Sequence, residues 1–158
     1  MITQEELMEM LSYNAETGEF KWRITGRGRG KNAVAGHVRG DGYCELFLNG
    51  NRDYAHRMAW LYVHGYIPSE IDHIDNNPSN NSIANLREAT RSANMGNSRA
   101  KVKSKTGIKG VHPTRWGFSA QITKDRKILH IGSYKTVEDA KEAYDKKALE
   151  LFGEFSNG

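Results

Sequence analysis

The sequence predicts an α+β protein built from two small units. In the C-terminal part, residues 110–113, 117–123 and 127–133 alternate between apolar and polar side chains, as β-strands do. Apolar residues at helical spacing follow over 136–151, so this part predicts three strands and one helix. In the middle of the chain, an extended segment at 71–75 leads into a polar loop and then into further helical spacing, an order compact enough for a single small site.

The two parts differ in charge. Residues 1–98 hold 10 Lys and Arg against 12 Asp and Glu, whereas residues 99–158 hold 13 against 7. Within 99–136 the single acidic residue is Asp125, and aromatic side chains lie among the basic ones. A charge run is often only a solvated face, but this asymmetry favours a surface that binds nucleic acid. We therefore predict a domain over 1–98, a basic linker over 99–106 and a DNA-binding domain over 107–158.

Composition excludes several classes of protein. With 37% hydrophobic and 9% aromatic residues in 158, the chain is polar but globular. The single cysteine, Cys44, excludes an internal disulfide and an all-cysteine zinc site, and we expect it to be a half-buried strand residue. No apolar run is long enough to span a bilayer and the first residues resemble no signal peptide, so we expect a cytoplasmic, intracellular protein.

The N-terminal residues predict short elements separated by turns. We expect a helix over 2–13 that Thr3 caps, and then a strand over 20–23. The glycine-rich string 26–31 is only a weak signal for a phosphate cradle, because no apolar strand precedes it, and we interpret it as a basic loop beside DNA. Further on we expect strands over 36–48 broken by a turn at 39–42, a turn at 49–50, and a helix over 56–64 that ends at Gly65.

Asp72, His73, Asn85 and Asn94 form the constellation with the clearest chemistry. Hydrolysis of a phosphodiester needs an activated water and a cation near the phosphate. A carboxylate such as Asp72 suits Mg²⁺, and an imidazole such as that of His73 can accept a proton near neutral pH. Neighbouring side chains on a regular strand point to opposite faces of the sheet. Asp72 and His73 can therefore serve one site only if the strand is irregular there. By themselves, these residues fit an ordinary asparagine-rich turn as well as they fit a catalytic site.

Several motifs in succession resemble a known family. His56-Arg57-Met58-Ala59-Trp60, Ile71-Asp72-His73-Ile74-Asp75, Asn80-Asn81, Asn85-Leu86-Arg87 and Thr90-Arg91-Ser92-Ala93-Asn94 resemble the HNH homing endonucleases of phages and their hosts, as does the upstream segment 13–22. Residues 107–111 and 152–155 begin and end a segment similar to the Apetala-type (AP2) DNA-binding domain of plants. The resemblance implies a ββα-metal nuclease motif followed by an AP2-like three-stranded antiparallel sheet on one helix.

The HNH resemblance also implies roles for individual residues. His73 is the expected general base, Asp72 and Asn94 are the expected ligands of one Mg²⁺ or Mn²⁺ ion, and Asn85 is expected to brace the loop that carries the histidine. Because a neutral amide binds Mg²⁺ more weakly than a carboxylate, we expect weak metal binding without DNA. We interpret His56, like His37 and His64, as structural.

The AP2 resemblance implies that the outer face of the sheet reads the major groove. The expected DNA-binding residues are Lys109, His112, Arg115, Trp116, Gln121, Thr123, Lys127 and His130. Alternation independently predicts that Phe118, Ala120, Ile122, Leu129 and Ile131 face the helix. Because His112, Thr114, Gln121 and Thr123 stand where the plant domains have other residues, including arginines, the plant recognition sequence is not expected to carry over.

Three functions are compatible with these patterns. The first is a metal-dependent DNA endonuclease whose partner is double-stranded DNA, with no membrane and no required protein partner; without dimerisation heptads it should act as a monomer and nick one strand. The alternative is a catalytically inactive AP2-type DNA-binding regulator, which plasmid incubation with and without Mg²⁺ would separate from the first. A nuclease toxin is a third, and no secretion or immunity feature supports it.

Overall fold

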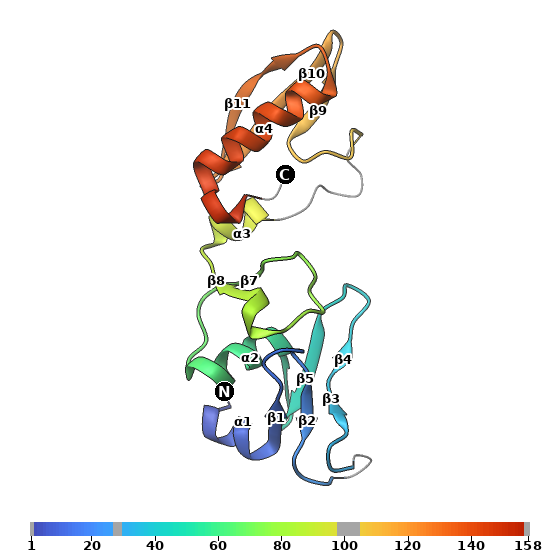
Figure 1. Ribbon diagram of the computed structural model, residues 1–158, viewed down its shortest axis with the longest axis vertical. Coiled ribbons are helices and arrows are strands. Elements are labelled where there is room, and N and C mark those ends of the chain that lie inside the picture. Colours follow the sequence, from blue (N-terminus) through green and yellow to red (C-terminus); the bar gives the residue numbers. More distant parts are fainter. Residues whose placement is uncertain (1, 27–29, 98–104, 157–158) are drawn as a thin grey trace. The chain divides into compact units, whose positions relative to one another are not determined.

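The computed structural model describes residues 2–26, 30–97 and 105–156 and divides into two compact units, Met1–Glu88 and Ala89–Gly158. Figure 1 shows the elements of each unit. Most of the predicted linker over 99–106 and the centre of the predicted glycine-rich loop, residues 27–29, lie outside the described residues. The division between the units precedes the helix that contains Asn94, so that helix is grouped with the C-terminal unit. The predicted domain boundary at residue 98 stays a prediction.

The first unit is a mixture of short strands and helices (Figure 1). Its elements are α1 (Gln4–Met10), β1 (Leu11–Tyr13), β2 (Phe20–Trp22), β3 (Val34–Ala35), β4 (His37–Val38), β5 (Cys44–Leu48), β6 (Asn51–Tyr54), α2 (Ala55–His64), β7 (Ile71–His73), the 3₁₀ helix η1 (Ile83–Asn85) and β8 (Leu86–Glu88). The strands form two three-stranded antiparallel sheets, in the orders β1-β2-β3 and β4-β5-β6, and the pair β7-β8.

Helix α1 begins at the predicted cap and ends earlier than predicted. The Thr3 hydroxyl accepts a hydrogen bond from the backbone of Glu6, whose carboxylate accepts one from the backbone of Thr3. This reciprocal capping box fixes the start of the helix. The predicted end at residue 13 is wrong, because Leu11–Tyr13 leaves the helix and pairs with Phe20–Trp22.

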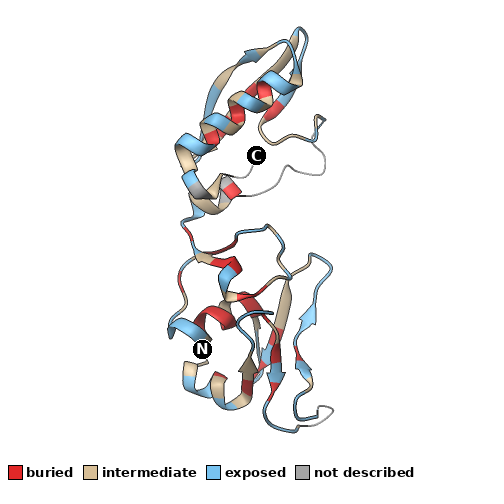
Figure 2. Cartoon of the chain, viewed as in Figure 1, coloured by how far each residue is buried: buried red, intermediate tan, exposed pale blue. Residues whose placement is uncertain are grey.

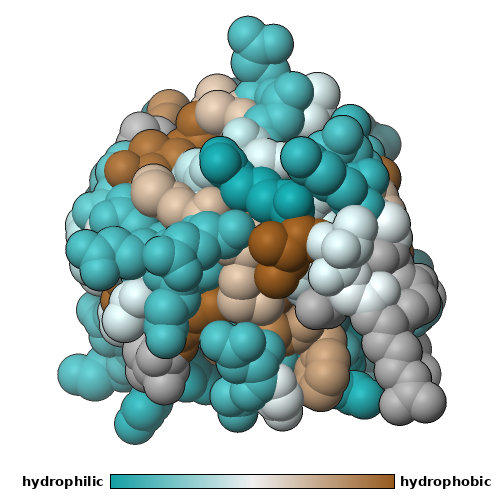
Figure 3. Space-filling model, turned by 90° about the horizontal axis from the view of Figure 1, so that it is seen from below, coloured by the Kyte–Doolittle hydropathy of each residue, from teal (hydrophilic) through white to brown (hydrophobic). Residues whose placement is uncertain are grey.

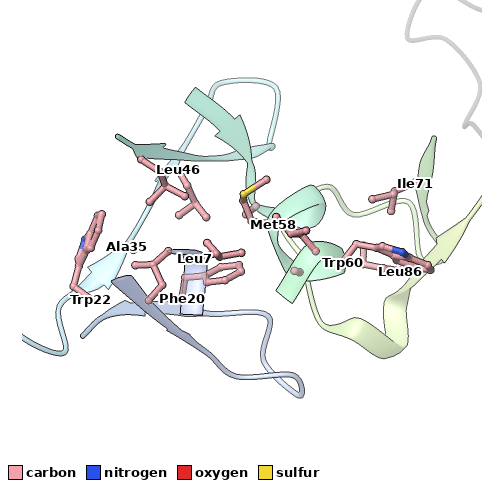
Figure 4. Packing of buried hydrophobic residues seen from close by; sticks show 14 residues of the cluster. Leu7, Phe20, Trp22, Ala35, Leu46, Met58, Trp60, Ile71 and Leu86 are labelled. Carbon is pink, nitrogen blue, oxygen red and sulfur yellow. The ribbon is translucent and has the colours of Figure 1, made fainter. Parts of the chain in front are cut away.

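Helix α2 lies at the centre of the hydrophobic core of the first unit. It buries Met58, Ala59, Trp60 and Leu61. In Figure 4, Leu7, Phe20, Ala35 and Leu46 gather with Met58 on one side, and Ile71 and Leu86 lie near Trp60 on the other. Figure 2 shows the buried residues concentrated on α2 and the strands around it. Each large apolar side chain buried here contributes about 1.5–3 kcal/mol, so α2 joins β7-β8 firmly to the N-terminal strands.

The segment after the polar loop is not the helix that the sequence predicts. Residues 83–88 form η1 and then β8, which pairs antiparallel with β7, and an α-helix begins only at Arg91. The apolar spacing misleads because Ile83 packs at the edge of the core while Leu86 is buried from a strand. The polar loop therefore connects two strands and leads into a helix, in the order β7, β8, α3.

The second unit contains the predicted three strands and helix. Its elements are α3 (Arg91–Asn97), β9 (Val111–Thr114), β10 (Gly117–Lys124), β11 (Lys127–Tyr134), α4 (Val137–Phe152) and the 3₁₀ helix η2 (Gly153–Phe155). The strands form an antiparallel sheet in the order β11-β10-β9. Thr136 caps α4, whose buried side chains Ala140, Tyr144 and Ala148 pack with Val111, Ala120 and Ile122 of the sheet.

The alternation along β11 is correct only in part. Ile131 packs against the core of the second unit. Leu129 lies directly opposite buried Ile122 and so on the predicted inner face, but it is 39% exposed. A register irregularity lies opposite, between Ala120 and Gln121 on β10. Such a bulge adds a residue to one strand and changes the twist, which breaks a simple alternation.

The surface shown in Figure 3 is mostly hydrophilic, with hydrophobic side chains in small separate areas. Among the residues that the structure describes, every helix is too short or too polar to cross a bilayer. Cys44 is half-buried on β5, as predicted, and burial raises the pKa of its thiol.

Candidate active site

Strand β7 carries the two residues from which the sequence predicts catalysis. Ile71, Asp72 and His73 are all buried, and the strand pairs regularly with β8, Asp72 opposite Arg87 and His73 opposite Leu86. The strand ends at His73, whose carbonyl accepts a hydrogen bond from the backbone of Asn76 in a tight turn. His73 is therefore the last residue of a strand that the core holds, at the mouth of a polar loop.

Asp72 is ion-paired inside the protein. Its side chain is 5% exposed, and both Nε and Nη2 of Arg87 lie 2.8 Å from its Oδ2 atom. The two residues are a direct cross-strand pair, so the sheet register brings the charges together. The pair keeps a buried carboxylate compensated, since an unpaired charge in this position would be very costly.

His73 is oriented by Asn81. Its Nε2 atom lies 3.3 Å from the side-chain oxygen Oδ1 of Asn81. The Asn81 amide nitrogen donates to the carbonyl of Ser79 at 3.2 Å, which turns the amide oxygen toward the imidazole. An amide oxygen only accepts hydrogen bonds, so this arrangement selects the tautomer with the proton on Nε2 and leaves Nδ1 as the basic nitrogen.

The ring of His73 also packs in an aromatic cluster. His56 meets it in a T-shaped contact with centroids 5.1 Å apart, and Tyr43 meets it at 6.0 Å. His56 is stacked on Tyr54 as well, which agrees with the predicted structural role of His56. Its Nδ1 atom is buried with no hydrogen-bond partner among the described residues. The cluster limits rotation of the His73 ring.

Burial sets the protonation of both histidines. It lowers the pKa of His73 below its ordinary value, although the Asn81 hydrogen bond and the charges of Asp75 and Asp72 oppose it. Burial, aided by His73 and Arg57, lowers the pKa of His56 to about 3. Both imidazoles are thus neutral at pH 7, the state in which a histidine can accept a proton.

Asn85 holds the loop that follows His73. Its amide nitrogen donates to Oδ1 of Asp75 at 2.9 Å and to the carbonyl of Asn80 at 2.8 Å, and its amide oxygen accepts from the backbone of Asp75 at 3.1 Å. Asn80 closes the loop from the other side by donating to Oδ2 of Asp75 at 2.7 Å. Burial raises the pKa of Asp75, but the hydrogen bonds from Asn80, Asn77 and Asn85 outweigh it and the pKa is lowered overall.

Asn94 belongs to the second unit. It lies on α3, is half-buried, and its backbone N–H donates to the carbonyl of Thr90 at 2.9 Å. Asp72, His73 and Asn85 thus lie within the first unit, and Asn94 is carried by a helix of the other. Because β7 is regular, Asp72 and His73 point to opposite faces of the strand, and the irregularity that a site shared by the two requires is not found there. In the part of the chain that the structure describes, no three His, Cys, Asp or Glu side chains gather in a way that could hold a metal ion.

The expected DNA-binding residues of the second unit differ in exposure. Trp116 is 82% exposed, and the Arg115 guanidinium lies 4.8 Å from its ring centroid. The amide of Gln121 donates to Nε2 of His112 at 2.9 Å across the β9–β10 pair. His112, Arg115, Lys127 and His130 are exposed and Gln121 and Thr123 half-buried. Lys109 is half-buried, and burial lowers its pKa to about 8.

Comparison with known proteins bears on the segment just described. Residues 53–96 match the family model described as HNH endonuclease. These residues, called here the HNH segment after the family that they match, are similar to that family. The HNH segment contains α2, β7, η1, β8 and most of α3, and therefore all four residues of the predicted catalytic constellation.

Two relatives carry the same family name. An uncharacterized HNH endonuclease of Acanthamoeba polyphaga mimivirus is 36% identical over 104 residues, which cover 64% of this chain and 54% of that protein. The chain thus spans about half the length of this curated relative. A solved structure concerning DNA binding and cleavage by the HNH homing endonuclease I-HmuI is similar at 28% identity and a TM-score of 0.39, over 53% of this chain and 48% of that one.

Two residues of the site had no role in the sequence-based scheme. Arg87 was part of a motif only, yet it neutralises Asp72, and Asn81 was one asparagine in a polar loop, yet it orients His73. No sequence signal could have found the role of Arg87, because its place opposite Asp72 depends on β8, a strand that the apolar spacing did not predict. No pattern in the sequence distinguishes Asn81 from Asn77 or Asn80 before the turns are known.

Proposed function

We propose that the protein is a divalent-metal-dependent DNA endonuclease that nicks one strand of a duplex. The observation that carries the proposal is the state of His73: within a segment that matches the HNH endonuclease family, a buried, neutral imidazole is held by Asn81 with Nδ1 as its basic nitrogen. A general base needs a fixed position and a neutral resting state, and both conditions are met. In the proposed reaction, His73 Nδ1 accepts the proton of the water that attacks the scissile phosphate.

Asp72 and Asn94 are the proposed ligands of the cation. Carboxylate and amide oxygens suit Mg²⁺ or Mn²⁺ rather than zinc, which favours nitrogen and sulfur. Mg²⁺ commonly binds through one or two protein oxygens and completes its shell with water and substrate phosphates, so this small set of donors fits one such ion. When bound, the ion would supply positive charge at the leaving oxygen.

Asn85 supports the proposed reaction without touching DNA. The three hydrogen bonds that it makes with Asp75 and Asn80 keep the loop after His73 closed. Because the loop also carries Asn81, the same closure holds the partner of the imidazole. Asn85 is thus proposed as a positioning residue.

The second unit is proposed to bind the duplex through an AP2-like sheet. Exposed Trp116 and Arg115 offer a stacking surface, the Gln121–His112 pair offers hydrogen-bonding groups, and Lys127 of β11 adds positive charge. Phosphate contacts would give affinity, and the polar side chains of β9 and β10 would read bases.

Supercoiled plasmid tests the proposal directly. The full-length protein with Mg²⁺ should convert it to the nicked circle, and chelation should stop the conversion. His73→Ala should lower the rate by about 10²–10⁴-fold, as expected for loss of a general base, with DNA affinity nearly unchanged. His64→Ala is the matched control, because His64 lies exposed on α2 and its ring meets Trp60 in a tilted contact. Wild-type rates in His73→Ala would refute the assigned base.

One observation favours the alternative of a catalytically inactive DNA-binding regulator. The carboxylate proposed to bind the cation is already neutralised by Arg87 and buried. If a metal cation never replaces Arg87 beside Asp72, the protein would bind DNA and leave it intact. Gel shifts that show tight DNA binding, with no nicking in Mg²⁺ or Mn²⁺, would establish this alternative.

A further inference from the structure

The turn formed by Asn14–Gly18 lies outside the HNH segment, yet it contacts the loop of the candidate site. The turn is closed by its own hydrogen bonds, since the Asn14 side-chain oxygen accepts from the backbones of Glu16 and Thr17 at 2.9 and 3.1 Å. The backbone N–H of Gly18 also donates a hydrogen bond to the carbonyl of Asn14 at 2.8 Å. The turn is therefore a preformed unit that can support a neighbouring segment.

Three contacts connect this region to residues 81–83. The Tyr13 hydroxyl donates to the backbone carbonyl of Asn81 at 2.7 Å, and the backbone of Ile83 donates to the carbonyl of Ala15 at 3.0 Å. Gly18 has φ +76°, and a Cβ built on it would lie 2.3 Å from the carbonyl carbon of Asn81 and 2.4 Å from the nitrogen of Ser82. Only glycine permits so close an approach of the two backbones.

Asn81 connects these contacts to His73. Its backbone carbonyl is held by Tyr13, and its side-chain oxygen lies 3.3 Å from Nε2 of His73. The ring of Tyr13 cannot easily shift, because it packs against Phe20 at 4.7 Å and Tyr62 at 5.5 Å. A rigid aromatic side chain thus fixes the residue that orients the imidazole.

We propose that Tyr13 and the turn 14–18 are positioning elements of the active site, which act through Asn81 to hold His73 in one tautomer and orientation. The proposal rests on the endonuclease function for its catalytic consequence. It extends the functional unit to residues upstream of position 53, where the match to the family model begins. None of these residues needs to touch DNA or metal.

The full-length Tyr13→Phe variant tests the proposal, because it removes one hydroxyl and keeps the ring. Loss of this hydrogen bond should lower kcat about tenfold, because a small displacement of a catalytic group slows the reaction. The KM for plasmid and the Mg²⁺ midpoint should stay unchanged. Nitrogen-15 NMR of the imidazoles at pH 7.5, with the His73 signal assigned from its loss in His73→Gln, should show a smaller share of the Nε2-protonated form. Tyr66→Phe is the control, since its hydroxyl donates to exposed Glu88 at 3.0 Å, away from Asn81.

Gly18→Ala gives a second, independent test against Gly50→Ala. Both glycines have positive φ, +76° and +82°, but the space around Gly50 is open. The two variants therefore share the backbone strain, and only Gly18→Ala also pushes on Asn81 and Ser82. Gly18→Ala should lose more activity and more stability than Gly50→Ala and should disturb the His73 signal. If it does not fold, Tyr13→Phe alone decides the proposal.

The two measurements separate failure of this proposal from failure of the endonuclease function. If the wild-type protein does not nick DNA but the His73 tautomer still depends on Tyr13, positioning stands and the endonuclease function is wrong. If the wild type nicks, and Tyr13→Phe leaves both kcat and the His73 signal unchanged, the positioning role is overturned. A loss of kcat that comes with an equal loss in Tyr66→Phe would overturn it as well.

Discussion

Arg87 lies directly opposite Asp72 on the β7–β8 pair, and its guanidinium Nε and Nη2 atoms are each 2.8 Å from the same carboxylate oxygen. The pair lies in the interior, so its removal has a different cost from the loss of a surface ion pair. It also means that a cation proposed to bind Asp72 must share that carboxylate with a guanidinium. The relationship thus connects stability and metal binding in a single contact.

Arg87→Met should destabilise the protein strongly. Breaking a buried pair by removing one partner costs about 3–5 kcal/mol, because the other charge stays buried. Arg57→Met is the matched control, since Arg57 pairs with Asp53 at 3.0 Å but both side chains are about 30% exposed; such a pair contributes about 0–1 kcal/mol. Urea denaturation measures both. Equal losses in the two variants would mean that the Asp72–Arg87 pair is effectively solvated.

Asn85→Ala should lower stability and activity together. It removes the amide that holds Asp75 and Asn80. Because Asp75 is exposed and Asn80 half-buried, water can take over part of these contacts, and each lost hydrogen bond should cost about 0.5–1.5 kcal/mol. The Mg²⁺ midpoint should not move, because Asn85 is proposed as a brace. Asn51→Ala, which removes an exposed amide bonded to the carbonyl of Asn49, is the control. A shifted Mg²⁺ midpoint at full stability would instead make Asn85 a ligand.

The sequence predicted elements well where local chemistry decides them. Thr3 caps a helix as expected, since a hydroxyl before an acidic first turn is a local signal, and Thr136 caps α4 by the same chemistry. The helix predicted directly after the polar loop is wrong, because the pairing of Leu86 with His73 depends on residues distant in sequence. Local spacing contains no information about such a partner.

The same distinction separates the predicted site residues from the missed ones. Asp72, His73 and Asn85 could be named from motifs, because their residue types indicate their chemistry. The contribution of Asn81 depends on the direction of its amide, which the Ser79 carbonyl fixes, and that of Tyr13 depends on a contact across 68 positions of sequence. Positioning residues of this kind become visible only in three dimensions.

Lys109 should make the stability of the protein depend on alkaline pH. Burial lowers its folded-state pKa from 10.5 to about 8. Between these values the unfolded chain binds more protons than the folded one, so this lysine makes stability rise as pH increases from about 8 to 10.5. Lys109→Met should therefore be more stable than wild type at pH 7, by a margin that shrinks across that window. Thermal unfolding at pH 7, 8.5 and 10 measures the margin, with the exposed Lys135→Met as control. A margin independent of pH would show that Lys109 is not desolvated.

Trp116 and Lys127 should contribute differently to DNA binding. Trp116 is 82% exposed in the turn between β9 and β10, the strands whose polar side chains are proposed to read bases, so Trp116→Ala should weaken binding to a preferred duplex more than to a scrambled one. Lys127, exposed at the start of β11, should contact phosphate only, and Lys127→Ala should weaken both about equally and reduce the salt dependence of affinity. Gel shifts at two salt concentrations, with a duplex enriched from a random library by the full-length protein and its scrambled control, measure both effects. Equal losses on the two duplexes in Trp116→Ala would limit the tryptophan to non-specific contact. Unchanged binding in both variants would mean that the sheet is not the DNA-binding surface, and that the positive charge of the second unit faces another partner.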